Sequence, residues 1–292
     1  RYTYSTSDLH DQRAMAAVKD RREIEKAVAS NKGIGDASFM KIYDITFSPT
    51  GGTQKAVDIL AESLEGEVEA IDLTDEYVDF GQTEISPEDV VILAVPSYGG
   101  RVPAPVSERL AGLEGHKARA VLFCAYGGRA YEDTLIELRD LAKKAGFKVI
   151  AAVAAVTEHS IARQFAAGRP DEADRKQLTD FGKMIRQKIL SGDLSEPKIP
   201  GNRPYKKGGG LQMIPKPDEN CSGCGLCAAK CPVQAIDPRD VRKVDSSKCI
   251  YCMRCRAICP QSARKLNPAM LTVVEQMLEK ACTQHKAYEL CI

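Results

Sequence analysis

The sequence lacks any long apolar run. In its 292 residues, no stretch approaches the roughly 20 apolar residues that a membrane-spanning helix requires, so we expect no membrane span. The pair Arg21-Arg22 is followed by charged residues and not by an apolar stretch, which argues against an export signal at that point. We therefore expect a cytoplasmic location.

Two nucleotide-binding motifs are also missing. No G-K-[ST] follows a glycine-rich loop, and no G-x-G-x-x-G occurs, which argues against a nucleoside triphosphatase loop and a dinucleotide fingerprint. No nucleophile–base pair or acid–base constellation is visible, so we predict no catalytic residues, and whether the chain is an enzyme stays open. A net charge of +1 with 28% charged residues suits two domains, the smaller of which needs bound metal for stability.

Cysteine, in contrast, is abundant. Eight of the 11 cysteines form two copies of C-x₂-C-x₂-C-x₃-C-P, namely Cys221, Cys224, Cys227 and Cys231, and Cys249, Cys252, Cys255 and Cys259. Three thiolates on a short loop can wrap one face of an iron–sulfur cube, while the fourth points toward a second cube. We therefore predict two [4Fe–4S] clusters with crossed ligation, one held by Cys221, Cys224, Cys227 and Cys259 and the other by Cys249, Cys252, Cys255 and Cys231.

Two other uses of cysteine fit this spacing less well. Structural zinc needs four ligands per ion and leaves no purpose for the regular third cysteine of each copy. A disulfide framework is typical of small secreted domains, which this chain does not resemble. The segment 211–266 is similar to the two-cluster bacterial ferredoxin, in which the positions of Ala235-Ile236 and Val244-Asp245 form short strands.

The charge of this segment agrees with bound clusters. Residues 211–270 contain ten Lys or Arg against five acids. Each oxidised cluster with four thiolates carries a formal charge of about −2, so the loaded segment is close to neutral. We therefore do not interpret the basic residues as a nucleic-acid surface.

The segment 40–194 alternates apolar strands and helices. Strands are predicted at 42–47, 68–72, 90–95, 120–125 and 147–156, and helices at 53–64, 131–145 and 171–190. The strand at 90–95 is almost wholly apolar, as expected where helices cover both faces of a sheet. The fold class is α/β, a five-stranded doubly wound parallel sheet, followed by a small α+β domain that holds the two clusters.

Ligands of such sheets bind at the carboxyl ends of the strands. After the first predicted strand, residues 48–53 lead directly into a helix, where backbone N–H groups and the helix dipole favour a phosphate. Two more loops, 96–101 and 124–129, follow the third and fourth strands and share the sequence Tyr-Gly-Gly-Arg.

This set of loops resembles the flavodoxin family, in which the first loop binds the phosphate of FMN and the next two hold its isoalloxazine ring. Glycines allow the backbone to approach a flat ring, and tyrosines offer a face for stacking, Tyr98 first and Tyr126 second. The resemblance implies FMN as cofactor, bound by Ser48, Thr50, Gly51, Gly52, Thr53, Pro96, Ser97, Tyr98, Gly99, Gly100, Tyr126, Gly127 and Gly128.

Other residues have two open interpretations. Cys124 fits a buried inert thiol or a thiol near the flavin, and His159 fits a hydrogen-bonded loop residue or a lining residue. Arg101 and Arg129 are exposed arginines, or they face the flavin or an acidic partner. Cys282 and Cys291 lack ligand spacing, and we expect no role for them.

The domain boundaries follow from composition. Residues 1–39 are a polar extension with one helical pattern, either appended or an arm that docks on a partner; 40–194 is the flavodoxin-like domain, 195–220 a Pro/Gly-rich linker, 221–266 the ferredoxin-like domain and 267–292 a helix. The order of domains, with His159-Ser160-Ile161 and Ala167-Gly168-Arg169, resembles the flavodoxin–ferredoxin fusion proteins of anaerobes.

The cofactors indicate the function. Clusters transfer one electron at a time and a flavin accepts two, so one chain with both is expected to relay low-potential electrons to or from a redox partner protein. An FMN-dependent reductase of a quinone or nitro compound, fed by the clusters, is the alternative. A structural or assembly role, with the flavin lost, is a third possibility. The partner, the direction of electron flow, the reduction potentials and the oligomeric state stay open.

Overall fold

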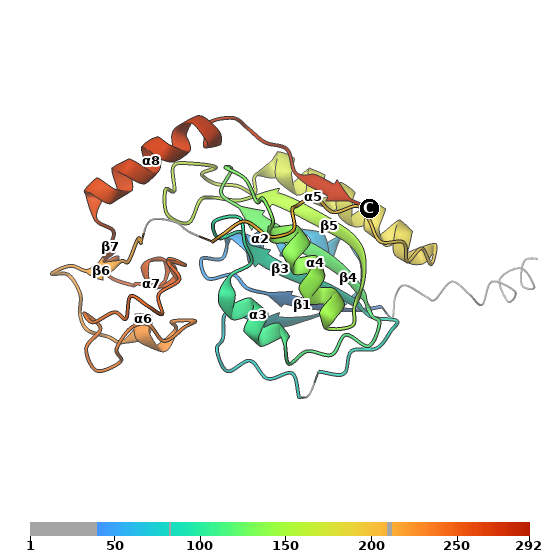
Figure 1. The fold of residues 1–292 in the computed structure, drawn as a ribbon, viewed down its shortest axis with the longest axis horizontal. Coiled ribbons are helices and arrows are strands. Elements are labelled where there is room, and N and C mark those ends of the chain that lie inside the picture. Colours follow the sequence, from blue (N-terminus) through green and yellow to red (C-terminus); the bar gives the residue numbers. More distant parts are fainter. Residues whose placement is uncertain (1–39, 82, 209–211) are drawn as a thin grey trace, which may run out of the picture.

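The computed structural model describes residues 40–81, 83–208 and 212–292 (Figure 1). The polar extension predicted at 1–39, with its helical pattern, lies outside the described residues. Among the described residues, none of the helices combines the length and the apolar character needed to cross a membrane.

A parallel sheet forms the centre of the larger half. Its parallel strands run in the order β2-β1-β3-β4-β5, and they are β1 (Lys41–Thr46), β2 (Glu67–Asp72), β3 (Val90–Pro96), β4 (Arg119–Tyr126) and β5 (Lys148–Val156). This is the doubly wound order of flavodoxin-like folds, which reverses between β1 and β3. The prediction of five parallel strands in an α/β sheet is therefore confirmed.

Helices cover both faces of this sheet, which explains why β3, β4 and β5 are almost entirely apolar and buried. The helices are α2 (Gly52–Glu62), α3 (Ala104–Leu110), α4 (Thr134–Lys144) and α5 (Glu172–Leu190). α2 and α5 pack together so closely that a Cβ on Gly182 would lie 2.4 Å from that of Ser63. Figure 1 shows α3 and α4 in front of the sheet, on the face opposite to α5.

The C-terminal segment returns to this sheet. α8 (Pro268–Cys282) is capped by Asn267, whose side chain accepts hydrogen bonds from the N–H groups of Ala269 and Met270. After it, β8 (Glu289–Cys291) pairs antiparallel with β5 at the sheet edge (Figure 1). The prediction of a helix alone over 267–292 missed this sixth strand, because three residues are too short for a periodic pattern.

The smaller half has little regular structure. It contains β6 (Lys216–Pro217), α6 (Leu226–Ala229), α7 (Arg254–Ala257) and β7 (Arg264–Lys265), with β6 antiparallel to β7. Ile236 and Val244 form an isolated antiparallel bridge, at the place where short strands were expected. Its buried hydrophobic clusters are small, one of them being Cys227, Ala228, Ile236 and Val241.

Candidate functional site

Four cysteines from distant parts of the smaller half line one cavity of about 350 Å³, which we name the outer cavity. Cys221 and Cys224 lie on the loop before α6, Cys227 lies in α6 and Cys259 follows α7. Gly225, at the start of α6, has φ 79°, a left-handed conformation that turns the loop around the cavity.

A second cavity of about 390 Å³, the inner cavity, is lined by Cys249, Cys252, Cys255 and Cys231. In each cavity, three cysteines of one sequence copy meet the last cysteine of the other copy. This grouping supports the crossed ligation predicted from the spacing.

The cavities suit a cluster better than a single ion. Within the described ranges, no three His, Cys, Asp or Glu side chains converge on a point that could hold one metal ion. The thiols are instead spread around a space, as required when each binds a different iron of a cube. Burial raises the pKa of both Cys252 and Cys255 to about 12, so metal charge is needed to stabilise their thiolates.

The inner cavity faces the larger half. Arg254 Nη1 donates to the carbonyl of Pro49 at 3.4 Å, and Arg256 Nη1 donates to that of Ile161 at 3.2 Å. Arg109 also donates to the carbonyl of Pro232. These contacts reach only segments 231–234 and 249–257, which border the inner cavity, while Cys224 of the outer cavity is exposed.

The predicted phosphate loop, residues 48–53, connects β1 to α2 and is named the cradle below. Gly51 has φ 86° and precedes the first residue of α2, a conformation that favours glycine. Ser48 Oγ accepts the N–H of Gln54 at 3.0 Å, which fixes the loop against the helix. Thr53 is buried, and Gly52 leaves room for Thr157. The loop therefore leads directly into the start of α2, and phosphate binding there stays a prediction.

An open cavity of about 820 Å³ lies over the cradle. Three segments line it, namely the cradle with α2, the loop after β5, and the inner-cavity loop. The lining residues are Thr50, Gly52, Lys55, Glu158, Ser160, Arg163, Gly168, Arg169, Met253, Arg256 and Ala257. The sequence prediction missed Lys55 and Arg256. Arg256 lies between Cys255 and Cys259 in the sequence, and only the fold brings it to the cradle.

The charge of this cavity suits an anion. Arg163 and Arg169 are already paired with Glu158 and Asp174. Among the described residues, no acid lies within ion-pair distance of Lys55 or Arg256. Next to the cradle, Arg254 Nε is buried without any hydrogen-bond partner in the described parts of the chain. An unused donor and two unpaired cations fit a phosphate bound at the start of α2.

The loop after β3 lies close to the inner cavity. Tyr98 is half-buried against the sheet core and forms a tight turn with Arg101, with hydrogen bonds of 3.0 and 3.2 Å between their backbones. Burial, and then the nearby Cys252, raise the pKa of the Tyr98 hydroxyl. Tyr98 is therefore packed against the sheet core, and stacking of its ring on a flavin stays a prediction.

The tyrosine of the loop after β4 is more deeply buried. Tyr126 is the last residue of β4, only 5% exposed, and its ring lies edge-to-face to that of Tyr131 with 5.4 Å between the ring centroids. Stacking of Tyr126 on a flavin stays a prediction.

The glycines and Ser97 serve packing. A Cβ on Gly100 would collide with Glu132, and one on Gly127 would collide with His159. Ser97 Oγ is bonded to Thr134 Oγ1 at 2.7 Å. The cavity over the cradle is thus lined by Thr50 and Gly52 of the predicted residues, and not by the predicted residues between Pro96 and Gly128.

His159 is a structural residue. Its Nδ1 accepts the N–H groups of Ile161 and Ala162 at 3.2 and 3.1 Å. Burial, helped by Arg129, lowers its pKa to about 4, so the ring is neutral at physiological pH. Cys124 is fully buried in β4, as the inert interpretation required.

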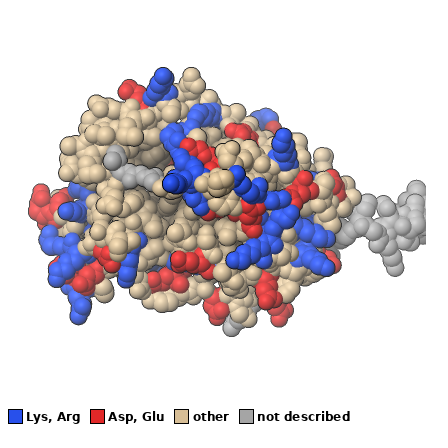
Figure 2. All heavy atoms as spheres, viewed as in Figure 1, with Lys and Arg blue, Asp and Glu red and all other residues tan. Residues whose placement is uncertain are grey.

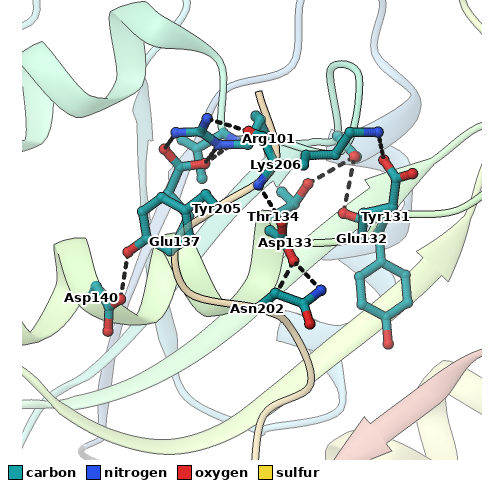
Figure 3. A network of polar contacts seen from close by, with 12 residues as sticks. Arg101, Tyr131, Glu132, Asp133, Thr134, Glu137, Asp140, Asn202, Tyr205 and Lys206 are labelled. Atoms are coloured by element: carbon teal, nitrogen blue, oxygen red, sulfur yellow. Dashed lines mark hydrogen bonds and ion pairs between the residues drawn. The ribbon is translucent and has the colours of Figure 1, made fainter. Parts of the chain in front are cut away.

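The linker is bound to the larger half (Figure 3). Asp133, at the N-cap position of α4, does not cap the helix; its carboxylate accepts the N–H groups of Asn202 at 2.8 Å and Lys206 at 2.7 Å. Arg101 donates to the carbonyl of Lys206 at 2.8 Å, and Lys206 Nζ contacts Glu132 at 2.6 Å. The segment 202–206 is therefore held against the loops that follow β3 and β4.

Comparisons with known proteins identify the smaller half. Residues 220–286 match the model of the family "4Fe-4S dicluster domain". Two uncharacterized proteins of Methanocaldococcus jannaschii are similar in sequence, one 43% identical over 49 residues and the other 49% identical over 41 residues. These matches cover 16% and 14% of this chain and 19% of each relative. The smaller half is therefore a domain for two [4Fe–4S] clusters.

Solved structures resemble the larger half weakly. An archaeal flavodoxin has a TM-score of 0.37 at 15% identity, covering 51% of this chain and 99% of its own. The flavodoxin of Megasphaera elsdenii gives 0.37 at 17% identity, covering 50% and 98%, and rubredoxin oxygen:oxidoreductase of Desulfovibrio gigas gives 0.40 at 17%, covering 53% and 38%. The strand order and not these scores identifies the fold.

Crossed ligation predicts which cluster each variant loses. The intact chain is expected to hold about eight iron and eight sulfide. Cys231→Ala should damage the cluster of the inner cavity and Cys259→Ala that of the outer cavity, each leaving about four iron. Iron analysis and paramagnetic resonance of the reduced variants can separate the two sites. Loss of the cluster bound by the variant's own sequence copy would contradict the crossing.

The linker contacts predict protection from proteolysis. Asp133→Ala should release the half-buried Lys206 and speed trypsin cleavage there by roughly tenfold or more, since one hydrogen bond to a charged group contributes about 1.5–3 kcal/mol. The matched control is Asp193→Ala, an exposed carboxylate that bonds only the nearby Ser195. Equal cleavage of both variants would exclude a role for Asp133 in holding the linker.

The same contact has a defined pH dependence. Burial opposes ionisation of Asp133, but the N–H groups of Lys206 and Asn202 lower its pKa below the ordinary value. Its contribution to stability is thus complete above about pH 4 and is lost as the pH falls through the lower folded pKa. Hydrogen exchange of segment 202–206, measured in steps below pH 4, should show this release, and Asp133→Ala should remove the step.

Proposed function

We propose that this chain is an electron-transfer flavoprotein, in which FMN at the cradle and two [4Fe–4S] clusters relay electrons to or from a redox partner protein. The observation that carries the proposal is that Met253 and Arg256, from the inner-cavity loop, line the same cavity as Thr50 and Gly52. The inner cluster site and the cradle are thus parts of one assembly.

The chain's own residues have distinct parts in this proposal. N–H groups at the start of α2 and the hydroxyls of Ser48, Thr50 and Thr53 would hold the phosphate, and Lys55 and Arg256 would balance its charge. Tyr98 would shield the flavin from water on the side of the inner cavity. When bound, FMN supplies the exchange of one or two electrons that links two-electron and one-electron carriers.

The arrangement also gives the relay an order. The inner cavity contacts the larger half through Arg254 and Arg256, whereas the outer cavity carries the exposed Cys224. We infer that a partner exchanges electrons at the outer cluster, and that the inner cluster connects it to the flavin.

The alternative, direct reduction of a small molecule, needs open space beside the ring loops. The bound linker lies there instead: a Cβ on Gly100 would approach both Glu132 and Lys206. Figure 2 shows Lys and Arg interspersed with Asp and Glu over the visible face. These features favour a protein partner over a small substrate.

FMN binding tests the cradle. Thr50→Ala and Lys55→Gln should each weaken FMN by about 1.5–3 kcal/mol, or roughly 10- to 150-fold, while riboflavin, which has no phosphate, should bind as before. Quenching of flavin fluorescence measures both affinities, and Lys176→Gln on the exposed face of α5 is the matched charge control. Equal weakening of FMN and riboflavin would place the phosphate elsewhere.

Partner-driven reduction tests the relay. In Cys259→Ala, reduction of the flavin by a reduced low-potential ferredoxin should slow by roughly tenfold or more, because the outer cluster is missing. Chemical reduction of the flavin by dithionite should be unchanged. Cys291→Ala, in β8, serves as a cysteine control outside both cavities. An unchanged ferredoxin-driven rate in Cys259→Ala would remove the clusters from the path and favour the small-molecule reductase.

A further inference from the structure

One buried arginine lies at the outer cavity. Arg264, in β7, is only 2% exposed and lines this cavity together with its four cysteines. Its Nη2 donates to Cys227 Sγ at 3.0 Å and to the carbonyl of Val241 at 2.6 Å, and its Nη1 donates to the carbonyl of Pro215 at 3.2 Å.

No carboxylate balances this charge. The acceptors of Arg264 are two neutral carbonyls and one sulfur atom, and among the described residues no Asp or Glu forms an ion pair with it. The next residue, Lys265, is exposed and lies 3.9 Å from Asp218. A buried cation without a counter-ion is strongly unfavourable. The negative charge that stabilises Arg264 must therefore come from the cysteine thiolates and the cofactor that they bind.

Arg264 contacts the two cavities unequally. Among the described residues, it donates no hydrogen bond to a cysteine of the inner cavity. Its direct N–H···S contact is with Cys227 alone, so the two cluster sites receive unequal stabilisation from one cation.

We propose that Arg264 is a tuning residue that raises the reduction potential of the outer cluster relative to the inner one. Reduction adds one electron and no proton, taking the cluster with its four thiolates from a charge of about −2 to about −3. The added charge is stabilised most at the sulfur that accepts the N–H of the guanidinium, because the low-polarity surroundings screen it little. The inference rests on the proposed function, in which the outer cavity holds a cluster that takes Cys227 as one of its ligands.

The test is a redox titration of the anaerobic, cluster-loaded full chain, followed by paramagnetic resonance. Cys224→Ser, at the exposed ligand, first identifies the signal of the outer cluster. Arg264→Gln should then lower the potential of that signal so that its one-electron equilibrium shifts at least tenfold, which corresponds to about 59 mV. The inner signal should shift less, and Lys265→Gln, which removes an exposed charge next in sequence, should move neither signal by that amount.

A second variant keeps the test decisive if Arg264→Gln binds its clusters poorly. Arg264→Lys keeps the charge but cannot reach all three acceptors with one planar group, so the outer potential should fall by less than in Arg264→Gln. If Arg264→Gln loses iron, the Arg264→Lys titration decides: no shift, or equal shifts of both signals, would overturn the proposal. Full iron with unchanged potentials in Arg264→Gln would also overturn it. Absence of clusters from the unmodified chain would instead refute the proposed function.

Discussion

Bonds between cysteine thiolates and metal are the interaction on which the smaller half depends. Its hydrophobic clusters contain only a few residues, and its strands β6 and β7 are two residues long. A segment of this size buries too little apolar surface to offset the entropy of ordering its loops. Because each cavity takes ligands from both sequence copies, the two clusters would tie the two copies into one unit.

The larger half has the opposite character. Its sheet is buried under helices and needs no cofactor to form a core. Contacts at four places attach the smaller half to it: the linker held by Asp133, Pro232 held by Arg109, the inner-cavity loop held through Arg254 and Arg256, and β8 paired with β5. The linker and the C-terminal segment both connect the smaller half to the larger half. Because these connections already restrict its movement, docking costs little further translational and rotational entropy, and the inner cavity stays beside the cradle.

Two arginines of the smaller half lie beside the proposed cofactor sites. Arg256 brings charge from the inner-cavity loop to the cradle, and Arg264 brings charge to the wall of the outer cavity. Both belong to segment 211–270, which has more Lys and Arg than Asp and Glu. From composition alone, we interpreted this excess only as a balance to the charge of the clusters. Their positions show that these cations differ in role. Arg256 faces the proposed phosphate, Arg264 contacts the sulfur of Cys227, and others, such as Lys265, face solvent.

The sequence by itself determined what depends on local spacing. The two cysteine motifs predict the ligand sets, since the spacing of thiols on a short loop decides what they can wrap. The apolar runs of β3, β4 and β5 indicate a sheet covered on both faces. Only the tertiary structure decided which of two Tyr-Gly-Gly-Arg loops presents its tyrosine. β3 ends before Tyr98, whereas β4 includes Tyr126 and buries it. The strand β8, the contact of Asp133 with the linker and the places of Arg256 and Arg264 likewise join residues far apart in the chain, and no local pattern encodes such contacts.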